Sequence, residues 1–196
     1  MPQANYYFEM ETFIDVTAKV DGTATIGSGV RIWQNVQIRE MANLGENVSV
    51  GKDSYLGVGV VIGDNSKVQN GAMIFEPALI SNGVFVGPGV IFTNDKFPRA
   101  VNPDLTQKTA KDWNFVGVKV GMGASIGAGA ICVAPLEIGP WSVVAAGAVV
   151  TRDVPAFTLV MGCPARPVAL VNESGQVIRW LKGRRLKAKF AELIGR

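Results

Sequence analysis

Two series of residues spaced eighteen apart in this chain are mostly polar, and their polar members are the first candidates for chemistry. One series holds Gln34, Lys52, Asn70 and Pro88, and a second holds Glu40, Val58, Glu76 and Asn94. An amide can orient an amine by hydrogen bonding, and a carboxylate can accept its proton. The 196 residues contain no histidine, so the chain offers neither an imidazole base nor a zinc site of three histidines. The reaction to look for is one that needs no imidazole.

The interval of eighteen is three times a shorter period of six. Apolar residues occupy every sixth position: Ile14, Val20, Ile26, Ile32, Ile38, Leu44, Val50, Leu56, Ile62, Val68, Ile74, Ile80, Val86 and Phe92. From Val30 to Val90, the positions four residues later are all small or β-branched. A helix repeats every 3.6 residues and a plain strand every two, so a period of six predicts a hexapeptide parallel β-helix.

In such a fold each group of six residues supplies a short strand, two inward side chains and a tight corner. Gly, Asn and Asp predominate at the expected corner position because they tolerate the left-handed backbone region, and only Met41 and Pro77 depart from this rule. Three groups close one triangular coil of eighteen residues. Residues eighteen apart therefore stack along one edge, about 4.8 Å apart.

The repeat is interrupted once. It stops after Phe92 and resumes at Val120, which predicts an ejected loop at 93–119. Loops of this length are usually functional, and Phe97, Trp113 and Phe115 indicate that part of this one is packed or grips a ligand.

After residue 161 the six-residue repeat no longer continues. We therefore divide it into a β-helix domain at 1–161 and a C-terminal extension at 162–196. Residues 175–196 place Leu186, Phe190 and Leu193 on one helical face, which predicts an amphipathic C-terminal α-helix. Its basic side chains fit a solvated face, a contact with ligand phosphates or a contact with an anionic membrane surface.

Composition narrows the class of protein. Hydrophobic residues make up 48% of the chain, which predicts a globular domain. No apolar run approaches the ~20 residues of a membrane span and the N-terminus lacks signal-peptide features, so we expect a cytoplasmic protein. Two cysteines are too few for a disulfide framework. The net charge of +3 lies mostly in the last twenty residues, so the body has no basic stripe for nucleic acid.

Several motifs resemble a known family. The segment "IGAGAICVAPLEIGPWSVVAAGAVVTRDVPAFTLVMGCPAR" is similar to the C-terminal coils of the left-handed hexapeptide-repeat acyltransferases. Within that superfamily, "RIWQNVQI", "KVQNGAMIFEP" and "FTNDKFPR" resemble the bacterial N-acetyltransferases of nucleotide-linked 3-amino sugars, especially those that use dTDP-3-amino-3,6-dideoxyhexoses. The resemblance covers roughly residues 14–168. Cys163 stands where the family usually has Asn, and Gln34 and Asn35 depart from the sister group that acts on a UDP-linked 3-amino uronic acid.

The resemblance implies a fold, partners and site residues. It implies an all-β, left-handed parallel β-helix that forms a homotrimer with sites between subunits, uses acetyl-CoA and holds no metal. Asn70 would orient the amine, with Glu76 as the alternative proton acceptor. The nucleotide sugar would contact Gln34, Phe75, Asn94, Lys96, Phe97 and Arg99. Acetyl-CoA would contact Ala128, Gly129, Ala146, Gly147, Arg152 and Arg166.

Each of these assignments has a structural alternative. Asn70 fits a corner residue, Glu76 fits a solvated carboxylate, and the Ala-Gly pairs fit simple turns. Phe97 could tether the loop to the body or to a neighbouring subunit instead of contacting the substrate.

The expected reaction is acetyl transfer from acetyl-CoA to the sugar's 3-amino group by direct attack. A neutral amine attacks a thioester unaided, whereas a hydroxyl needs a base such as imidazole, so the absence of histidine favours N-acetylation. The alternatives are a UDP-3-amino-uronic-acid N-acetyltransferase, another small-molecule acetyltransferase of the same fold, and a non-catalytic β-helix scaffold.

Overall fold

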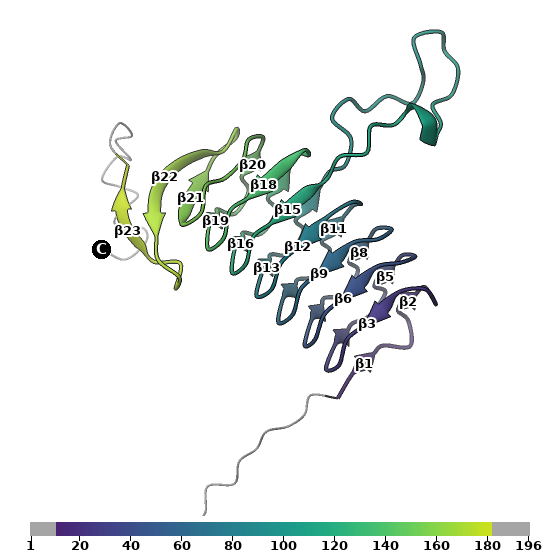
Figure 1. The fold of residues 1–196 in the computed structure, drawn as a ribbon, viewed down its shortest axis with the longest axis horizontal. Coiled ribbons are helices and arrows are strands. Elements are labelled where there is room, and N and C mark those ends of the chain that lie inside the picture. Colours follow the sequence, from purple (N-terminus) through teal and green to yellow (C-terminus); the bar gives the residue numbers. More distant parts are fainter. Residues whose placement is uncertain (1–10, 182–196) are drawn as a thin grey trace, which may run out of the picture.

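Strands of mostly two residues alternate with tight turns from Phe13 onward, and together they build a stack of three-sided coils (Figure 1). The computed structural model describes residues 11–181. Strands one coil apart pair in parallel, which produces three sheets that we call faces A, B and C. The period of six is thus a parallel β-helix, as predicted.

The three faces contain the following strands. Face A has β1 (Phe13–Ile14), β4 (Arg31–Ile32), β7 (Ser49–Val50), β10 (Lys67–Val68), β13 (Phe85–Val86), β16 (Ser125–Ile126), β19 (Val143–Val144), β21 (Thr158–Met161), β22 (Arg166–Val171) and β23 (Val177–Trp180). Face B has β2 (Lys19–Val20), β5 (Gln37–Ile38), β8 (Tyr55–Leu56), β11 (Met73–Ile74), β14 (Ile91–Phe92), β17 (Ile131–Cys132) and β20 (Val149–Val150). Face C has β3 (Thr25–Ile26), β6 (Asn43–Leu44), β9 (Val61–Ile62), β12 (Leu79–Ile80), β15 (Val118–Val120) and β18 (Leu136–Ile138).

The loop interrupts the chain without disturbing the stack. Paired residues are eighteen apart on either side of it, as in Lys67 and Phe85, whereas Phe85 pairs with Ser125, forty residues further on. The insertion therefore adds 22 residues to one coil and leaves the register intact. β15 starts at Val118, so the loop ends two residues before the predicted boundary. Figure 1 shows this loop projecting away from the coils.

The corners use the left-handed backbone that the sequence predicted. Asn35, Asn47 and Asp53 have φ of 56°, 56° and 59°. Met41, which departs from the corner rule in sequence, adopts the same conformation with φ of 56°. Its N–H donates to the Thr23 hydroxyl one coil earlier at 2.9 Å, which holds the turn. The left-handed backbone conformation is therefore tolerated at a methionine, because a hydrogen bond to the neighbouring coil fixes the turn.

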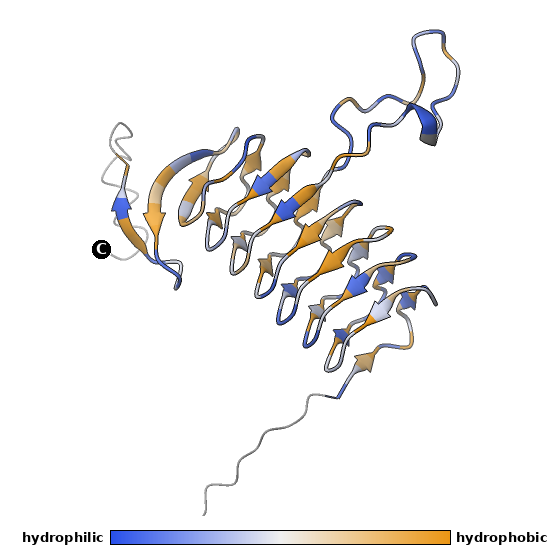
Figure 2. Ribbon diagram, in the orientation of Figure 1, coloured by the Kyte–Doolittle hydropathy of each residue, from blue (hydrophilic) through white to orange (hydrophobic). Residues whose placement is uncertain are grey.

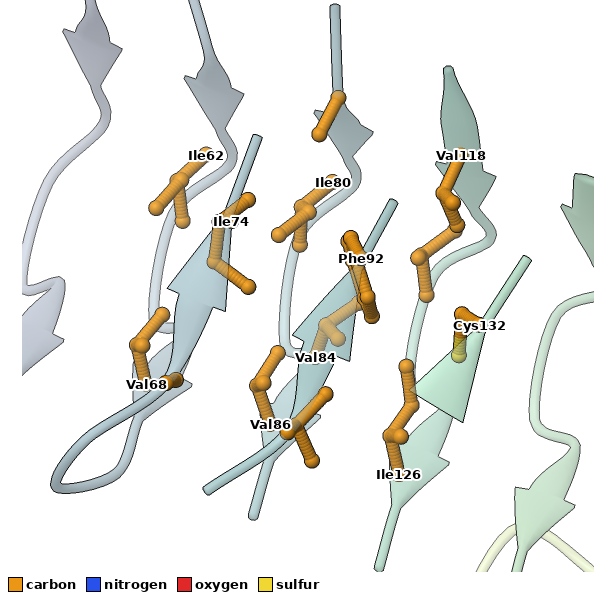
Figure 3. Close-up of a cluster of buried hydrophobic side chains, with 14 of the residues drawn as sticks. Ile62, Val68, Ile74, Ile80, Val84, Val86, Phe92, Val118, Ile126 and Cys132 are labelled. Atoms are coloured by element: carbon orange, nitrogen blue, oxygen red, sulfur yellow. The ribbon is translucent and has the colours of Figure 1, made fainter. Parts of the chain in front are cut away.

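The inward positions form one continuous apolar core. Side chains from all three faces, including Ile62, Ile74 and Phe92, meet along its axis (Figure 3). Figure 2 shows the apolar segments recurring in successive coils, with polar segments at many of the turns. Three buried inward positions are serines: Ser54 and Ser66 each donate a 3.0 Å hydrogen bond to a backbone carbonyl, and Ser142 donates to the Gly139 carbonyl at 2.7 Å. The core thus contains polar side chains only where they have acceptors.

The C-terminal end differs from the prediction. After β21 the chain turns back, and β22 and β23 pair antiparallel as a hairpin at the end of face A. The helix predicted from residue 175 onward is wrong for Val177–Trp180, which form β23, because backbone pairing with β22 overrides the helical pattern there. The residues on which that helix was based, Leu186, Phe190 and Leu193, lie outside the described residues.

Helix is scarce in residues 11–181. The described part has one short 3₁₀ helix, Ala110–Asp112, in the loop, capped by Thr109. None of its helices is long and apolar enough to cross a membrane.

The core predicts a sharp contrast between neighbouring residues. Ile74 is fully buried, whereas Met73 is 40% exposed. We expect Ile74→Ala to lower the free energy of unfolding by about 2–5 kcal/mol and Met73→Ala to change it by less than about 0.5 kcal/mol. Urea unfolding followed by circular dichroism measures both, and equal losses would contradict the inward and outward assignment.

Candidate active site

Face B separates two edges that carry the predicted site residues. The AB edge, between faces A and B, is a ladder of backbone hydrogen bonds. Gly89 N–H donates to the Asn70 carbonyl at 2.9 Å, and Gly147 N–H donates to the Ala128 carbonyl at 2.8 Å. This edge therefore places Asn70 in line with the predicted cofactor residues Ala128, Gly129, Ala146 and Gly147.

Two further predicted residues lie at the ends of the AB edge. Gln34 is two coils below Asn70, because its carbonyl accepts from Asp53 and that of Lys52 accepts from Gly71. Arg166 begins β22 at the other end, where the Ala165 N–H donates to the Val149 carbonyl at 2.7 Å. Toward the C-terminus the AB edge thus carries the small residues Ala128, Gly129, Ala146 and Gly147 and ends beside an arginine.

The BC edge, between faces B and C, carries the remaining candidates. Glu76 follows β11, Asn94 follows β14 and Arg152 follows β20, each two residues after its strand ends. Because these strands belong to one ladder, Asn94 lies one coil above Glu76, and Arg152 lies further along the same edge. Phe75 precedes Glu76 and faces outward on face B.

The two edges are not close to each other. Asn70 and Glu76 are six residues apart along extended chain, so they lie about 15–20 Å from each other. Within one chain, Asn70 and Glu76 are therefore too far apart to contact the same functional group of a substrate. A ligand that contacts both must span face B or lie between two chains.

Corner side chains elsewhere on the solenoid show what a purely structural residue does there. Asp64 and Asn82 each fold over a glycine of the preceding coil, Gly45 and Gly63, where a Cβ atom would collide with them. Asp64 Oδ1 accepts the Glu46 N–H at 2.8 Å, and Asn82 Oδ1 accepts the Asp64 N–H at 3.1 Å. Each of these side chains therefore staples one coil to the next.

Glu76 occupies the corresponding corner position in its own coil, but it makes no hydrogen bond to the preceding coil. Its carboxylate lies over Gly57, where a Cβ atom would overlap it. Its Oε2 is buried without a hydrogen-bond partner, and it is the one such side-chain atom found in residues 11–181. A buried acceptor without a donor costs roughly 1–3 kcal/mol, so a water molecule or a ligand that supplied a donor here would stabilise it.

Asn70 also covers a glycine, Gly51, without stapling a coil. Its side chain is exposed and makes no hydrogen bond to another described residue. Water can satisfy an exposed amide, so Asn70 indicates a ligand less strongly than Glu76 does.

The outward surface of face B is aliphatic toward the C-terminus and aromatic toward the N-terminus. Ile91, Ile131 and Val149 are half-buried and form an apolar strip beside the Ala-Gly pairs. Nearer the N-terminus, the rings of Tyr55 and Phe75 lie 5.2 Å apart. The face thus offers an apolar half and an aromatic half, which meet near Glu76 and Asn94.

The loop leaves the BC edge next to Asn94. The Trp113 indole N–H donates to the Asn94 carbonyl at 3.2 Å, and the Trp113 ring packs against Phe115 at 5.1 Å. This contact fixes the base of the loop. The predicted substrate residues Lys96, Phe97 and Arg99 are exposed, with Phe97 70% exposed and Lys96 5.6 Å from its ring. They do not approach the AB edge of their own chain.

Metal ligands and reactive thiols do not cluster in the described chain. Residues 11–181 contain no group of three or more side chains suited to hold a metal ion. Burial raises the pKa of the Cys132 thiol to about 12, so this residue is a core side chain rather than a nucleophile. Cys163 is exposed near the end of the AB edge.

Sequence reasoning missed two kinds of residue. Gly57 matters because it leaves room for the Glu76 carboxylate, and Arg39 and Tyr55 share face B with Phe75. Counting back nineteen residues from Glu76 would have found Gly57, since Asp64 and Asn82 have a glycine at the same spacing. Nothing in the sequence alone distinguishes the stapling side chains from the unpartnered one.

Comparison with known proteins supports the resemblance. The family model described as hexapeptide repeat of succinyl-transferase matches residues 42–76 and 115–152. A hexapeptide transferase family protein from Anaplasma phagocytophilum has the same fold, with a TM-score of 0.54, 18% identity and coverage of 85% of this chain and 87% of that chain. The hexapeptide repeat and the β-helix fold are thus confirmed.

Two curated relatives match over short stretches. Over 44 residues, 22% of this chain, it is 54% identical to a dTDP-3-amino-3,6-dideoxy-alpha-D-galactopyranose 3-N-acetyltransferase from Aneurinibacillus thermoaerophilus. Over 48 residues, 24% of this chain, it is 46% identical to a 2,3,4,5-tetrahydropyridine-2,6-dicarboxylate N-acetyltransferase from Staphylococcus aureus. These stretches span 23% and 20% of the two relatives.

The unpartnered carboxylate predicts an unusual stability pattern. Asp64→Ala removes a stapling hydrogen bond and should lower the free energy of unfolding by about 1 kcal/mol. Glu76→Met keeps an unbranched side chain of similar length but removes the unpaired oxygen, so stability should stay equal or rise by up to about 1 kcal/mol. Urea unfolding of both variants without ligand tests this. A loss for Glu76→Met as large as that for Asp64→Ala would show that the carboxylate is structural.

Proposed function

We propose that this chain, a β-helix of hexapeptide repeats, is an N-acetyltransferase that moves an acetyl group from acetyl-CoA to the 3-amino group of a nucleotide-linked amino sugar. The acceptor that we favour is a dTDP-3-amino-3,6-dideoxyhexose. The match to a relative named for that substrate class supports this choice, as does the absence of histidine from the chain. A cytoplasmic location accompanies the proposal.

The single observation that carries the proposal is the buried, unpartnered Oε2 of Glu76. An amine offers the N–H donors that this oxygen lacks. With one N–H held by the carboxylate, the nitrogen lone pair can be directed at the thioester carbon, which converts a collision into an oriented attack. The C–N bond forms, the C–S bond breaks, and the amine proton passes to the carboxylate or to the departing thiolate.

Neighbouring groups complete the proposed acceptor site. Asn94 lies one coil above Glu76 on the same edge and would hold a sugar hydroxyl or the amine. Phe75 would pack against the apolar side of the sugar ring. These residues come from successive coils, so the register of the solenoid sets their spacing.

Acetyl-CoA would lie along the AB edge and the apolar half of face B. The exposed Ala128, Gly129, Ala146 and Gly147 leave the backbone open to a long, thin ligand arm. Arg166 at one end of the edge and Arg152 across face B would meet its phosphates. Because Asn70 lies on this edge, we now assign it to the thioester side of the reaction rather than to the amine.

A site divided between two edges favours an assembly. In a trimer, the AB edge of one chain could face the BC edge and loop of the next, and all three contacts would be equivalent. The exposed Phe97 and Leu105, at 70% and 80%, give the loop apolar surface to bury against such a neighbour.

Substrate and site can be tested together. Thiol release from acetyl-CoA is measured with dTDP-3-amino-3,6-dideoxyglucose, its galacto epimer, a UDP-3-amino uronic acid and an α-amino dicarboxylic acid. We expect turnover with a dTDP sugar. Glu76→Gln should lower kcat by about 100-fold because a neutral amide can hold an amine N–H but cannot take its proton, whereas Asn70→Ala should act mainly on the KM for acetyl-CoA.

The other outcomes separate the alternatives. Turnover confined to the uronic acid or to the amino dicarboxylate would replace the proposed acceptor. A Glu76→Gln variant as active as the wild type would remove the role given to the carboxylate. Failure to bind acetyl-CoA would favour the non-catalytic scaffold.

Mixed trimers test whether sites lie between subunits. Glu76→Gln damages the BC edge, and Ala146→Trp fills the AB edge at an exposed position where the added ring need not disturb the core. If each site joins the two edges of different chains, random mixing of these inactive variants restores about a quarter of wild-type activity, since that fraction of contacts pairs two intact edges. If both edges of one chain form the site, the mixture stays inactive.

A further inference from the structure

The part of face B below Phe75 has no role in the function proposed above. It presents Lys19, Gln37, Arg39 and Tyr55, and we call these residues, with Phe75 at their upper end, the lower face B. Arg39, Gly57 and Phe75 occupy one column on successive coils, because β5, β8 and β11 pair in register. Gly57 has no side chain, so the surface between Arg39 and Phe75 is open except for the Glu76 carboxylate.

Arg39 is held in one orientation. Its Nε and Nη2 donate to the two carboxylate oxygens of Glu40 at 2.8 and 3.1 Å, and its Nη1 lies 3.5 Å from the Tyr55 hydroxyl. The hydrogen bond to Glu40, and then the one to Tyr55, raise the pKa of Arg39 above its ordinary value, so it is always charged. A guanidinium has five N–H donors, and the bonds to Glu40 and Tyr55 leave some of them free. This is a positioned fork of the kind that binds phosphate in bidentate fashion.

Two cations and two carboxylates lie together at the N-terminal end of the lower face B. A shallow hollow of about 250 Å³ is lined by Lys19, Val20, Asp21, Gln37, Ile38, Arg39 and Glu40. Of its two carboxylates, Asp21 accepts the N–H and hydroxyl of Thr23 at 2.9 and 2.6 Å, and Glu40 is paired with Arg39. Lys19 forms no ion pair with any residue of the described range. The cationic groups of this hollow that keep N–H donors for a phosphate are Lys19 and Arg39.

We propose that the lower face B binds the diphosphate of the nucleotide-linked substrate, with Arg39 and Lys19 on the phosphates and the Tyr55–Phe75 pair under the sugar. This assignment rests on the proposed function, because it takes Glu76 as the position of the amine. Arg39 lies two coils from Phe75, about 10 Å, a distance that a hexose and its phosphates can bridge. The Glu76 carboxylate lies over Gly57, one coil above Arg39 and next to Tyr55, so a sugar between them would present its phosphate to Arg39 and its amine to Glu76.

This places the phosphates on the body of the protein rather than on the loop. The loop cations Lys96 and Arg99 are exposed, and Arg99 Nη1 donates to the carbonyl of its neighbour Pro98 at 3.0 Å. Neither is fixed by a carboxylate as Arg39 is. A pre-positioned fork loses less side-chain entropy on binding than a mobile one, so Arg39 is the better phosphate ligand.

Binding of thymidine 5′-diphosphate alone, measured by titration calorimetry, tests the assignment without any turnover. Arg39→Gln should weaken binding by about 10- to 100-fold, and Arg39→Lys should recover only part of the loss because it lacks the fork. Tyr55→Phe should weaken binding by a smaller factor, since it removes a contact that positions Arg39. Arg31→Gln, a change of the same kind on face A, should leave binding unchanged.

The outcomes distinguish this inference from the proposed function. If Arg39→Gln binds thymidine diphosphate as the wild type does and Lys96→Gln or Arg99→Gln does not, the diphosphate belongs on the loop and the inference is overturned. Wild-type protein that binds no nucleoside diphosphate also overturns it. If the diphosphate binds through Arg39 but no amino sugar accepts an acetyl group, the phosphate site stands and the acceptor proposed for the enzyme is wrong.

Discussion

The parallel hydrogen-bond ladder between coils of eighteen residues is the constraint on which the rest of the structure depends. Each strand is only two residues long in most coils, so no strand is stable by itself. Stability comes from stacking, which buries two inward side chains in each group of six and satisfies the backbone of every coil with the next. A 22-residue insertion is tolerated because it leaves one coil at a corner and re-enters in register.

That constraint also arranges the chemistry. Side chains at one corner repeat along a straight edge. Residues remote in sequence, such as Asn70 and Ala146, therefore lie on the same edge of the molecule. Two edges with face B between them then provide one long surface: small residues and an apolar strip toward the C-terminus, aromatic rings and Arg39 toward the N-terminus. A long acyl carrier and a nucleotide sugar could approach each other on it, with Glu76 where the halves meet.

A corner side chain that makes no hydrogen bond to the neighbouring coil is a candidate for a functional role. Asp64 and Asn82 fold over a glycine and bond to the coil below, which is what the repeat requires. Glu76 folds over its glycine and bonds to nothing in the described chain. The same position therefore carries a structural role in two coils and an open acceptor in a third. With no histidine in the sequence, an acceptor of this kind suits an amine substrate better than a hydroxyl.

The sequence by itself determined the period of six, the two inward positions, the corner residues and the place of the loop, because a strict repeat has one way to bury its apolar side chains. It also identified which residues share an edge, since counting by eighteen follows from the same repeat. It was wrong about Val177–Trp180, where pairing with β22 decides the conformation. Only the tertiary structure fixed Arg39 between Glu40 and Tyr55 and showed that one carboxylate oxygen of Glu76 lacks a donor in the described chain. Those facts depend on side-chain contacts between coils, which spacing along the chain does not encode.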